Sequence, residues 1–288
     1  MTDYNNKQPE KKKSRLHLPH KRHRLALKTL VLAIIISAAF LNSIIIFTEQ
    51  DNRKYTSLWI LNITAAITSG LGIIAVYRHG LHGIHGKSYL FLTLGLLSWF
   101  SADAAELYYH LVEGHEEQKL VSISDWLWFA GYGFLSAHLF TVVSSLHGYI
   151  RRRVILMVSV ISVLFVGYNI HLLLSSDFIS IGEGNIDFVA LLVTVAYPIL
   201  DLTLIVPSGI ILTSLRKDYQ HSIPWFLASM SLLINAIADD GYVHDFVSEN
   251  SESLWFWNLF YITDFVIMAG ALFWYNRFHI SDEMSKKR

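Results

Sequence analysis

The chain has 288 residues, of which 53% are hydrophobic and only 16% carry a formal charge. Its mean hydropathy is +0.39. This composition excludes an ordinary soluble domain and is typical of an integral membrane protein. The absence of cysteine excludes disulfides and thiol chemistry. Because 23 Lys and Arg balance 23 Asp and Glu, the placement of the charges is more informative than their sum.

Apolar segments of about 20 residues can cross a bilayer as helices. Eight of them predict an all-α, polytopic membrane helix bundle, with residues 1–24 as a basic tail, 25–276 as the eight-helix bundle and 277–288 as a short tail. The segments are Leu25–Phe47, Thr56–Tyr77, Tyr89–His110, Asp125–Leu146, Val154–Leu174, Phe188–Leu212, Pro224–His244 and Leu254–Trp274.

Basic residues follow one side of this topology. They fill the tail before the first segment and recur in the loops around Arg78, Arg151 and Arg216, whereas the opposite loops are acidic, with Glu49 and Glu113 among them. The positive-inside rule therefore predicts a multi-pass protein of the cell membrane with both termini in the cytoplasm. The first segment is expected to be retained as a membrane helix, because it is too long for a signal-peptide core.

Three histidines, His79, His82 and His85, alternate with glycines between the second and third segments. The glycines favour a flexible turn, and metal capture is the alternative. The third segment then carries Asp103, Glu106 and His110, whose spacing stacks them on one helix face.

The later segments carry further acids. Asp125 begins the fourth segment, which also contains His138; Asp201 follows Pro198 in the sixth, and Pro207 is a second expected kink there. Asp239, Asp240 and His244 lie in the seventh segment, and Asp264 lies in the eighth. A charged acid at the centre of a membrane helix costs about 2.5 to 3.5 kcal/mol, so exposure of several of them to lipid is implausible.

We therefore expect an outward-facing polar pocket, with ligand-binding candidates Asp103, Glu106, Asp125, Asp201, Asp239, Asp240 and Asp264. A carboxylate and imidazole pair from each of two helices could bind a divalent metal through His110, His244, Glu106 and Asp240. A purely structural alternative has the acids neutral or hydrogen-bonded to backbone and to tyrosines such as Tyr108, Tyr109, Tyr242 and Tyr261. Passage of protons or cations is the remaining interpretation.

Several patterns bear on organisation and cofactors. Trp126, Trp128, Trp255 and Trp257 begin the fourth and eighth segments, where aromatic membrane anchors are expected unless the pocket uses one of them.

Asp103 and Asp239 lie at matching depth four helices apart, which suggests a parallel 4+4 repeat. No retinal, haem or nucleotide signature is present, and no nucleic-acid partner is expected. The expected partners are the lipid bilayer and a protein that receives a signal.

Short motifs over the third to eighth segments resemble the multi-helix membrane regions found N-terminal to some bacterial and archaeal histidine kinases and diguanylate cyclases. The motifs are Trp99 with Ala102-Asp103 and Glu106, Ser122-Ile123-Ser124-Asp125 with Trp128 and Gly131-Tyr132, Tyr197-Pro198 with Asp201, Ala238-Asp239, and Asp264. The resemblance implies a sensing pocket lined by Asp103, Asp125, Asp201, Asp239 and Asp264. The proline usual before Ser122 is missing, and no transmitter domain follows the last segment, so output through a partner protein is expected.

A second likeness supplies an enzyme alternative. Gly131, Leu135 and His138 approximate a pattern of the lysoplasmalogenase-like membrane hydrolases. The preferred expectation is a non-enzymatic membrane protein that binds a small ligand or cation. A lipid hydrolase, metal-dependent or using an activated water, and a cation- or proton-coupled transporter are the alternatives.

Overall fold

The computed structural model describes residues 18–112, 121–146, 150–175, 188–214, 219–247 and 255–279. Within these ranges the fold is all-α without a β-strand, as predicted. The helices are α1 (Leu18–Phe47), α2 (Gln50–His79), α3 (Gly83–Val112), α4 (Ile123–Ser145), α5 (Arg152–Ser175), α6 (Phe188–Ser214), α7 (Tyr219–Val247) and α8 (Trp255–Trp274), followed by a π-helical turn, η5 (Tyr275–His279). The tails before residue 18 and after residue 279, and the acidic segments 113–120, 176–187 and 248–254, lie outside the described residues.

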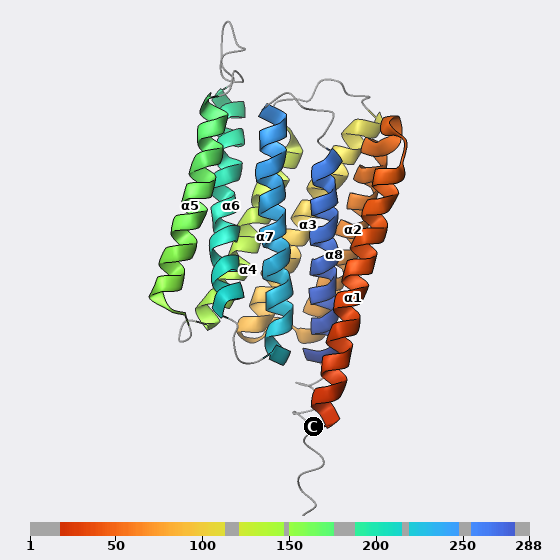
Figure 1. The fold of residues 1–288 in the computed structure, drawn as a ribbon, viewed down its shortest axis with the longest axis vertical. Coiled ribbons are helices and arrows are strands. Elements are labelled where there is room, and N and C mark those ends of the chain that lie inside the picture. Colours follow the sequence, from red (N-terminus) through yellow and green to blue (C-terminus); the bar gives the residue numbers. More distant parts are fainter. Residues whose placement is uncertain are drawn as a thin grey trace, which may run out of the picture.

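All eight helices are long and apolar enough to cross a membrane, and they correspond one to one with the predicted segments. They run roughly side by side as a single upright bundle (Figure 1). The end at which α1 stops and α2 starts is called the Glu49 end below, and the opposite end the Gly80 end. The cytoplasmic placement of both termini stays a prediction.

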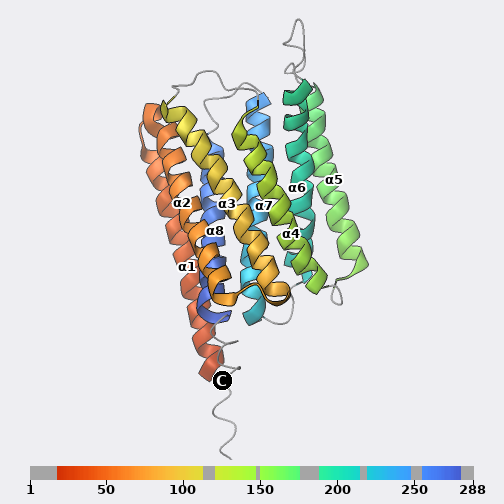
Figure 2. The ribbon, with the colours of Figure 1, turned by 180° about the vertical axis from the view of Figure 1, so that it is seen from behind.

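Six of the helices form a closed ring. Each of α2, α3, α4, α6, α7 and α8 packs against the next, and α8 returns to α2. Figure 2 shows α3 and α4 on one side of the bundle, with α7 and α8 behind them. Side chains on the inner faces of these helices therefore meet, although the helices are distant in sequence.

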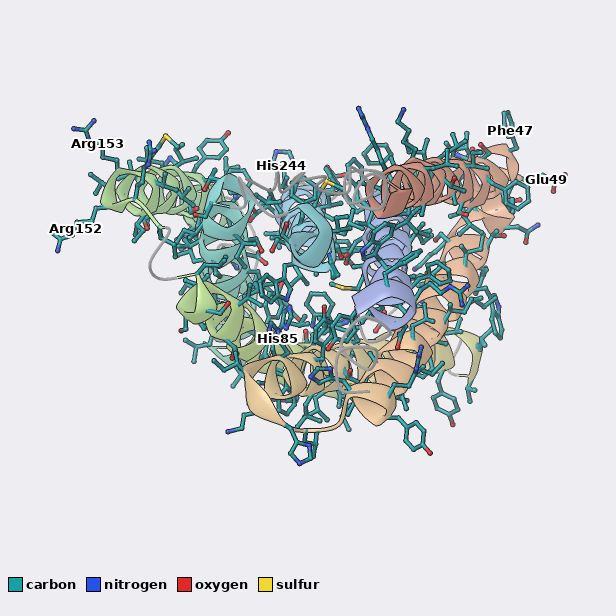
Figure 3. All side chains as sticks on the ribbon, turned by 90° about the horizontal axis from the view of Figure 1, so that it is seen from below. Phe47, Glu49, His85, Arg152, Arg153 and His244 are labelled. Atoms are coloured by element: carbon teal, nitrogen blue, oxygen red, sulfur yellow. The ribbon has the colours of Figure 1, made fainter. Side chains whose placement is uncertain are left out.

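The other two helices, α1 and α5, lie outside the ring. α1 packs mainly on α8, and α5 packs on α6 and α7. Viewed along the bundle, they occupy opposite outer corners (Figure 3). Only 6% and 17% of their spanning windows are buried, against at least 33% in each ring helix. Their apolar outer faces are thus available to lipid.

The ring places α2, α3 and α4 in the same neighbour order as α6, α7 and α8, which is the arrangement that a parallel repeat predicts. α1 and α5 depart from it, because α1 reaches mainly the last helix of the chain while α5 packs on the next two helices after itself. The 4+4 repeat therefore stays a prediction.

A glycine turn joins α2 to α3. Gly80 and Gly83 have φ angles of 76° and 72°, a left-handed conformation that glycine adopts without a steric penalty. The three histidines of this region separate as a result. His79 ends α2 beside the ring of Tyr275, while His85 enters α3 and stacks on Trp225 with ring centroids 5.2 Å apart.

Close packing fixes α3 against α4. A Cβ atom added at Gly131 would lie 2.2 Å from the Trp99 ring, so only glycine lets this indole lie directly on α4. The Trp99 ring also meets Tyr132 edge to face with centroids 5.5 Å apart, and its Nε1 donates to the carbonyl oxygen of Trp128 at 3.2 Å. These contacts set the rotation of α4 and turn Tyr132 into the ring.

Candidate functional site

The hydroxyl of Tyr132 on α4 joins two acids on different helices. It donates to Oδ1 of Asp201 on α6 at 2.7 Å and also contacts Oδ2 of Asp239 on α7. The other oxygen of Asp239 accepts from the hydroxyl of Tyr261 on α8 at 2.6 Å. Four helices thus converge on one carboxyl pair.

The Asp201 and Asp239 pair has fewer hydrogen-bond donors than its carboxylates need. A hydroxyl has one proton, so Tyr132 cannot donate to both carboxylates at once. Asp201 and Asp239 also interact with each other directly. Because two ionised carboxylates at this range repel strongly, a shared proton or a bound cation must stabilise them.

Asp240 is the neighbouring acid, and it lacks any such partner. The residue is only 4% exposed, and neither carboxyl oxygen accepts a hydrogen bond from the described residues. It interacts electrostatically with both Asp201 and Asp239. Oδ2 of Asp201 is likewise buried without a donor. Unpaired buried acceptors of this kind are rare because each costs free energy.

Access to the cluster differs among its members. Asp201 is 1% exposed, whereas Asp239 is partly exposed. Asp239 lies roughly 12 Å from Val247, the last residue of α7 at the Glu49 end, at about 1.5 Å per residue. Of Asp201, Asp239 and Asp240, only Asp239 is partly exposed.

Asp103 on α3 is a further acid of the same interior. Its Oδ1 accepts from the indole nitrogen of Trp128 on α4 at 3.1 Å, and its backbone oxygen accepts from the Asn62 amide on α2. It interacts electrostatically with Asp239. Trp128, predicted as a membrane anchor unless the site used it, is therefore a partner of a candidate acid.

Asp264 on α8 extends the cluster toward α7. The Ser231 hydroxyl donates to its carboxylate, and Asn235 forms a second side-chain hydrogen bond with it. It interacts electrostatically with Asp239 and Asp103. We refer to Asp103, Asp201, Asp239, Asp240 and Asp264 together as the carboxyl cluster.

Asp125 has a role at a helix end. It completes a capping box with Ser122, whose backbone nitrogen donates to its Oδ2 at 2.7 Å. Its Oδ1 accepts from the Tyr197 hydroxyl at 2.6 Å, which ties α6 to the start of α4. The predicted site residue is thus a cap and an interhelical tie, adjacent to the carboxyl cluster rather than within it.

The residues predicted to bind a divalent metal do not form a common group. On α3, Nε2 of His110 lies 3.3 Å from Oε1 of Glu106. On α7, His244 lies 3.5 Å from Asp245 and its side chain is 57% exposed, while Asp240 is buried. Over the part of the chain that the structure describes, no three His, Asp or Glu side chains are grouped to hold a metal ion. The divalent metal site therefore stays a prediction, and the described side chains do not provide the convergent ligand geometry that it needs.

His138, which carries the likeness to membrane hydrolases, lies on α4 at the α3 interface. Its side chain is 1% exposed, and its Nδ1 lies 2.8 Å from the Ser88 hydroxyl and 3.0 Å from the Ser88 carbonyl oxygen. This is the environment of a satisfied core histidine. The hydrolase alternative gains no support from it.

The sequence predicts the acids of the site better than their donors. Of the expected tyrosine partners, Tyr261 donates to Asp239, whereas Tyr108 is 58% exposed. Ser231 and Asn235 are donors that the sequence analysis does not predict. Their spacing of four and eight residues before Asp239 puts them on its helix face, and that pattern is the signal that could have found them.

Comparisons of the chain with protein-family models, with curated proteins and with solved structures find no match. The motifs that carry the resemblance to membrane sensor regions are nevertheless in contact with one another. Trp99 packs on Gly131 and Tyr132, Trp128 donates to Asp103, and Tyr197 donates to Asp125.

Proposed function

We propose that this integral membrane protein is a sensor that binds a small cation in the carboxyl cluster and reports its occupancy through a partner protein. The observation that carries the proposal is Asp240, a buried carboxyl group that receives no hydrogen bond from the described part of the chain, beside the Asp201 and Asp239 pair that shares one tyrosine hydroxyl. No Lys or Arg lies on α4, α6, α7 or α8 to neutralise these acids.

Electrostatics favours occupancy by a cation. An unpaired buried charge costs several kcal/mol, and an ion of opposite charge in a dry site offsets that cost. A cation that binds only the folded state also stabilises it, by about 2.7 kcal/mol at a concentration 100 times its Kd. Bound cation is therefore expected to raise the melting temperature.

Signalling is the second part of the proposal, and the resemblance to sensor regions supports it. The cluster joins α3, α4, α6, α7 and α8 through side chains of opposing helices. A cation drawn between these acids would shift the helices that carry them, and the change would reach a partner at a membrane surface. Association with a candidate partner should then depend on the cation and on Asp240.

The test of binding is a melting-temperature titration of purified protein in detergent. Chlorides of sodium, potassium, magnesium, calcium and ammonium are varied at constant ionic strength, maintained with a bulky organic cation. We expect a saturable rise with at least one of them. Asp240→Asn should lose this rise, while Asp51→Asn, at an exposed position in the first turn of α2, should keep it.

Two outcomes would refute the cation proposal. One is a melting temperature that does not respond to any of these cations. The other is a response that is the same in Asp240→Asn as in the unmodified protein.

Transport of the bound cation is a second candidate function, because Asp201 lies between Pro198 and Pro207 on α6. Proline removes a backbone hydrogen bond, and such positions in membrane helices allow bending. Uptake of the stabilising cation into proteoliposomes, abolished by Asp201→Asn, would establish transport. Binding without uptake would leave the sensor function alone.

A further inference from the structure

The carboxyl cluster has more hydrogen-bond acceptors than donors. The donors are single protons from Trp128, Tyr132, Tyr261 and Ser231, with the Asn235 amide near Asp264. Both oxygens of Asp240 and Oδ2 of Asp201 receive no proton from the described residues. A ligand with N–H donors would supply the missing protons, and a positively charged one would also offset the charge of the acids.

The arrangement of the acids disfavours a metal ion as that ligand. A hard metal ion requires several oxygens to converge on one point at short range. Within the described ranges, no set of three or more Asp, Glu or His side chains converges in this way. Asp103, Asp239 and Asp264 instead direct oxygens toward the donors on neighbouring helices.

Aromatic rings pack around Tyr132, whose hydroxyl contacts two of the acids. Tyr132 lies edge to face with Trp99 at 5.5 Å and with Tyr197 at 6.3 Å, and Tyr197 lies 5.0 Å from Phe129. The faces of such rings attract ammonium groups. The combination of buried carboxylates and aromatic rings is suited to a nitrogen cation.

We infer that the cation is an ammonium-type ion with N–H donors, either ammonium itself or a small protonated amine. Its N–H groups donate to Asp240 and to Oδ2 of Asp201, and its charge offsets the unpaired acids. Asp239, the partly exposed member, receives it on entry. The inference rests on the proposed function, since it names the class of cation for the same site.

Ammonium and potassium provide the sharp comparison, because they have the same charge and similar size but only ammonium has N–H donors. Melting temperature is measured for the full chain in detergent at constant ionic strength with ammonium, methylammonium, potassium or tetramethylammonium chloride. We expect ammonium or methylammonium to reach half of the maximal shift at a concentration at least tenfold lower than potassium does. Tetramethylammonium, which is charged but has no N–H group, should produce no saturable shift.

Asp240→Asn should remove the preference for ammonium over potassium, and Asp51→Asn should retain it. If Asp240→Asn does not fold, the comparison of the four salts on the unmodified protein still decides the inference. Equal or tighter binding of potassium, or of a metal ion alone, would overturn the ammonium assignment and leave the cation proposal intact. A lack of response to every cation would instead refute the proposed function itself.

Discussion

Tyr132 and Asp201 lie 69 residues apart in sequence, and the Tyr132 hydroxyl donates to Oδ1 of Asp201 over 2.7 Å in the buried interior of the helix ring. The same hydroxyl contacts Asp239, which is 107 residues away. A single proton thus lies at the junction of α4, α6 and α7. The cost of burying these acids without enough donors is the basis of the proposed cation site. The helix packing and the membrane topology support four further predictions.

Replacing Trp128 with Phe should destabilise the protein by about 1 to 3 kcal/mol. The change keeps an aromatic ring but removes the N–H that donates to Asp103, and a buried acceptor without a donor has a cost of this order. Equilibrium unfolding in detergent measures the loss. Trp126→Phe, two residues earlier on α4 and 59% exposed, should change stability by less than about 0.5 kcal/mol. Equal losses in both variants would contradict the role of the Trp128 N–H.

Gly131→Ala should be more damaging than Gly133→Ala. The Cβ atom at Gly131 would lie 2.2 Å from the Trp99 ring, whereas a Cβ atom at Gly133 has no neighbour within 4 Å. Overpacking of a close helix contact costs about 1 to 3 kcal/mol. Melting temperatures of the two variants in the same detergent test this difference, and a Gly131→Ala protein as stable as the original would show that α3 and α4 do not pack so closely.

Asp125→Ala should lower stability by about 0.5 to 2 kcal/mol, because it removes the capping box of α4. It also removes the acceptor of the Tyr197 hydroxyl, so the start of α4 separates from α6. The matched control is Glu49→Ala, since Glu49 is the N-cap residue of α2 but makes no side-chain cap hydrogen bond. Unfolding free energies of the two variants are compared, and a larger loss from the Glu49 change would disprove the assigned cap.

The predicted orientation can be measured with single cysteines, because the natural chain has none. Glu49→Cys lies at the junction of α1 and α2, and Leu81→Cys lies in the turn between α2 and α3 at the opposite end of the bundle. A membrane-impermeant maleimide applied to intact cells should label the first variant, and should label the second only after permeabilisation. The reverse pattern would show that the Glu49 end is cytoplasmic.

The sequence by itself determined the helices and the identity of the buried acids. Hydrophobic segments of bilayer length require helices, because only helices satisfy their own backbone hydrogen bonds in lipid. Asp103, Asp201, Asp239 and Asp264 could be recognised because an acid in such a segment is costly wherever it lies. Both properties are local to one segment and do not depend on its neighbours.

The tertiary structure alone decided which of these residues meet. Helix rotation and neighbour order turned Tyr132 toward Asp201 and Asp239, and left Asp240 buried without a donor among the residues that the structure describes. The same packing paired Glu106 with His110 on α3 and used Asp125 as a cap. Such outcomes depend on contacts between helices distant in the chain, such as Trp99 on Gly131, and hydropathy along a single helix does not encode them.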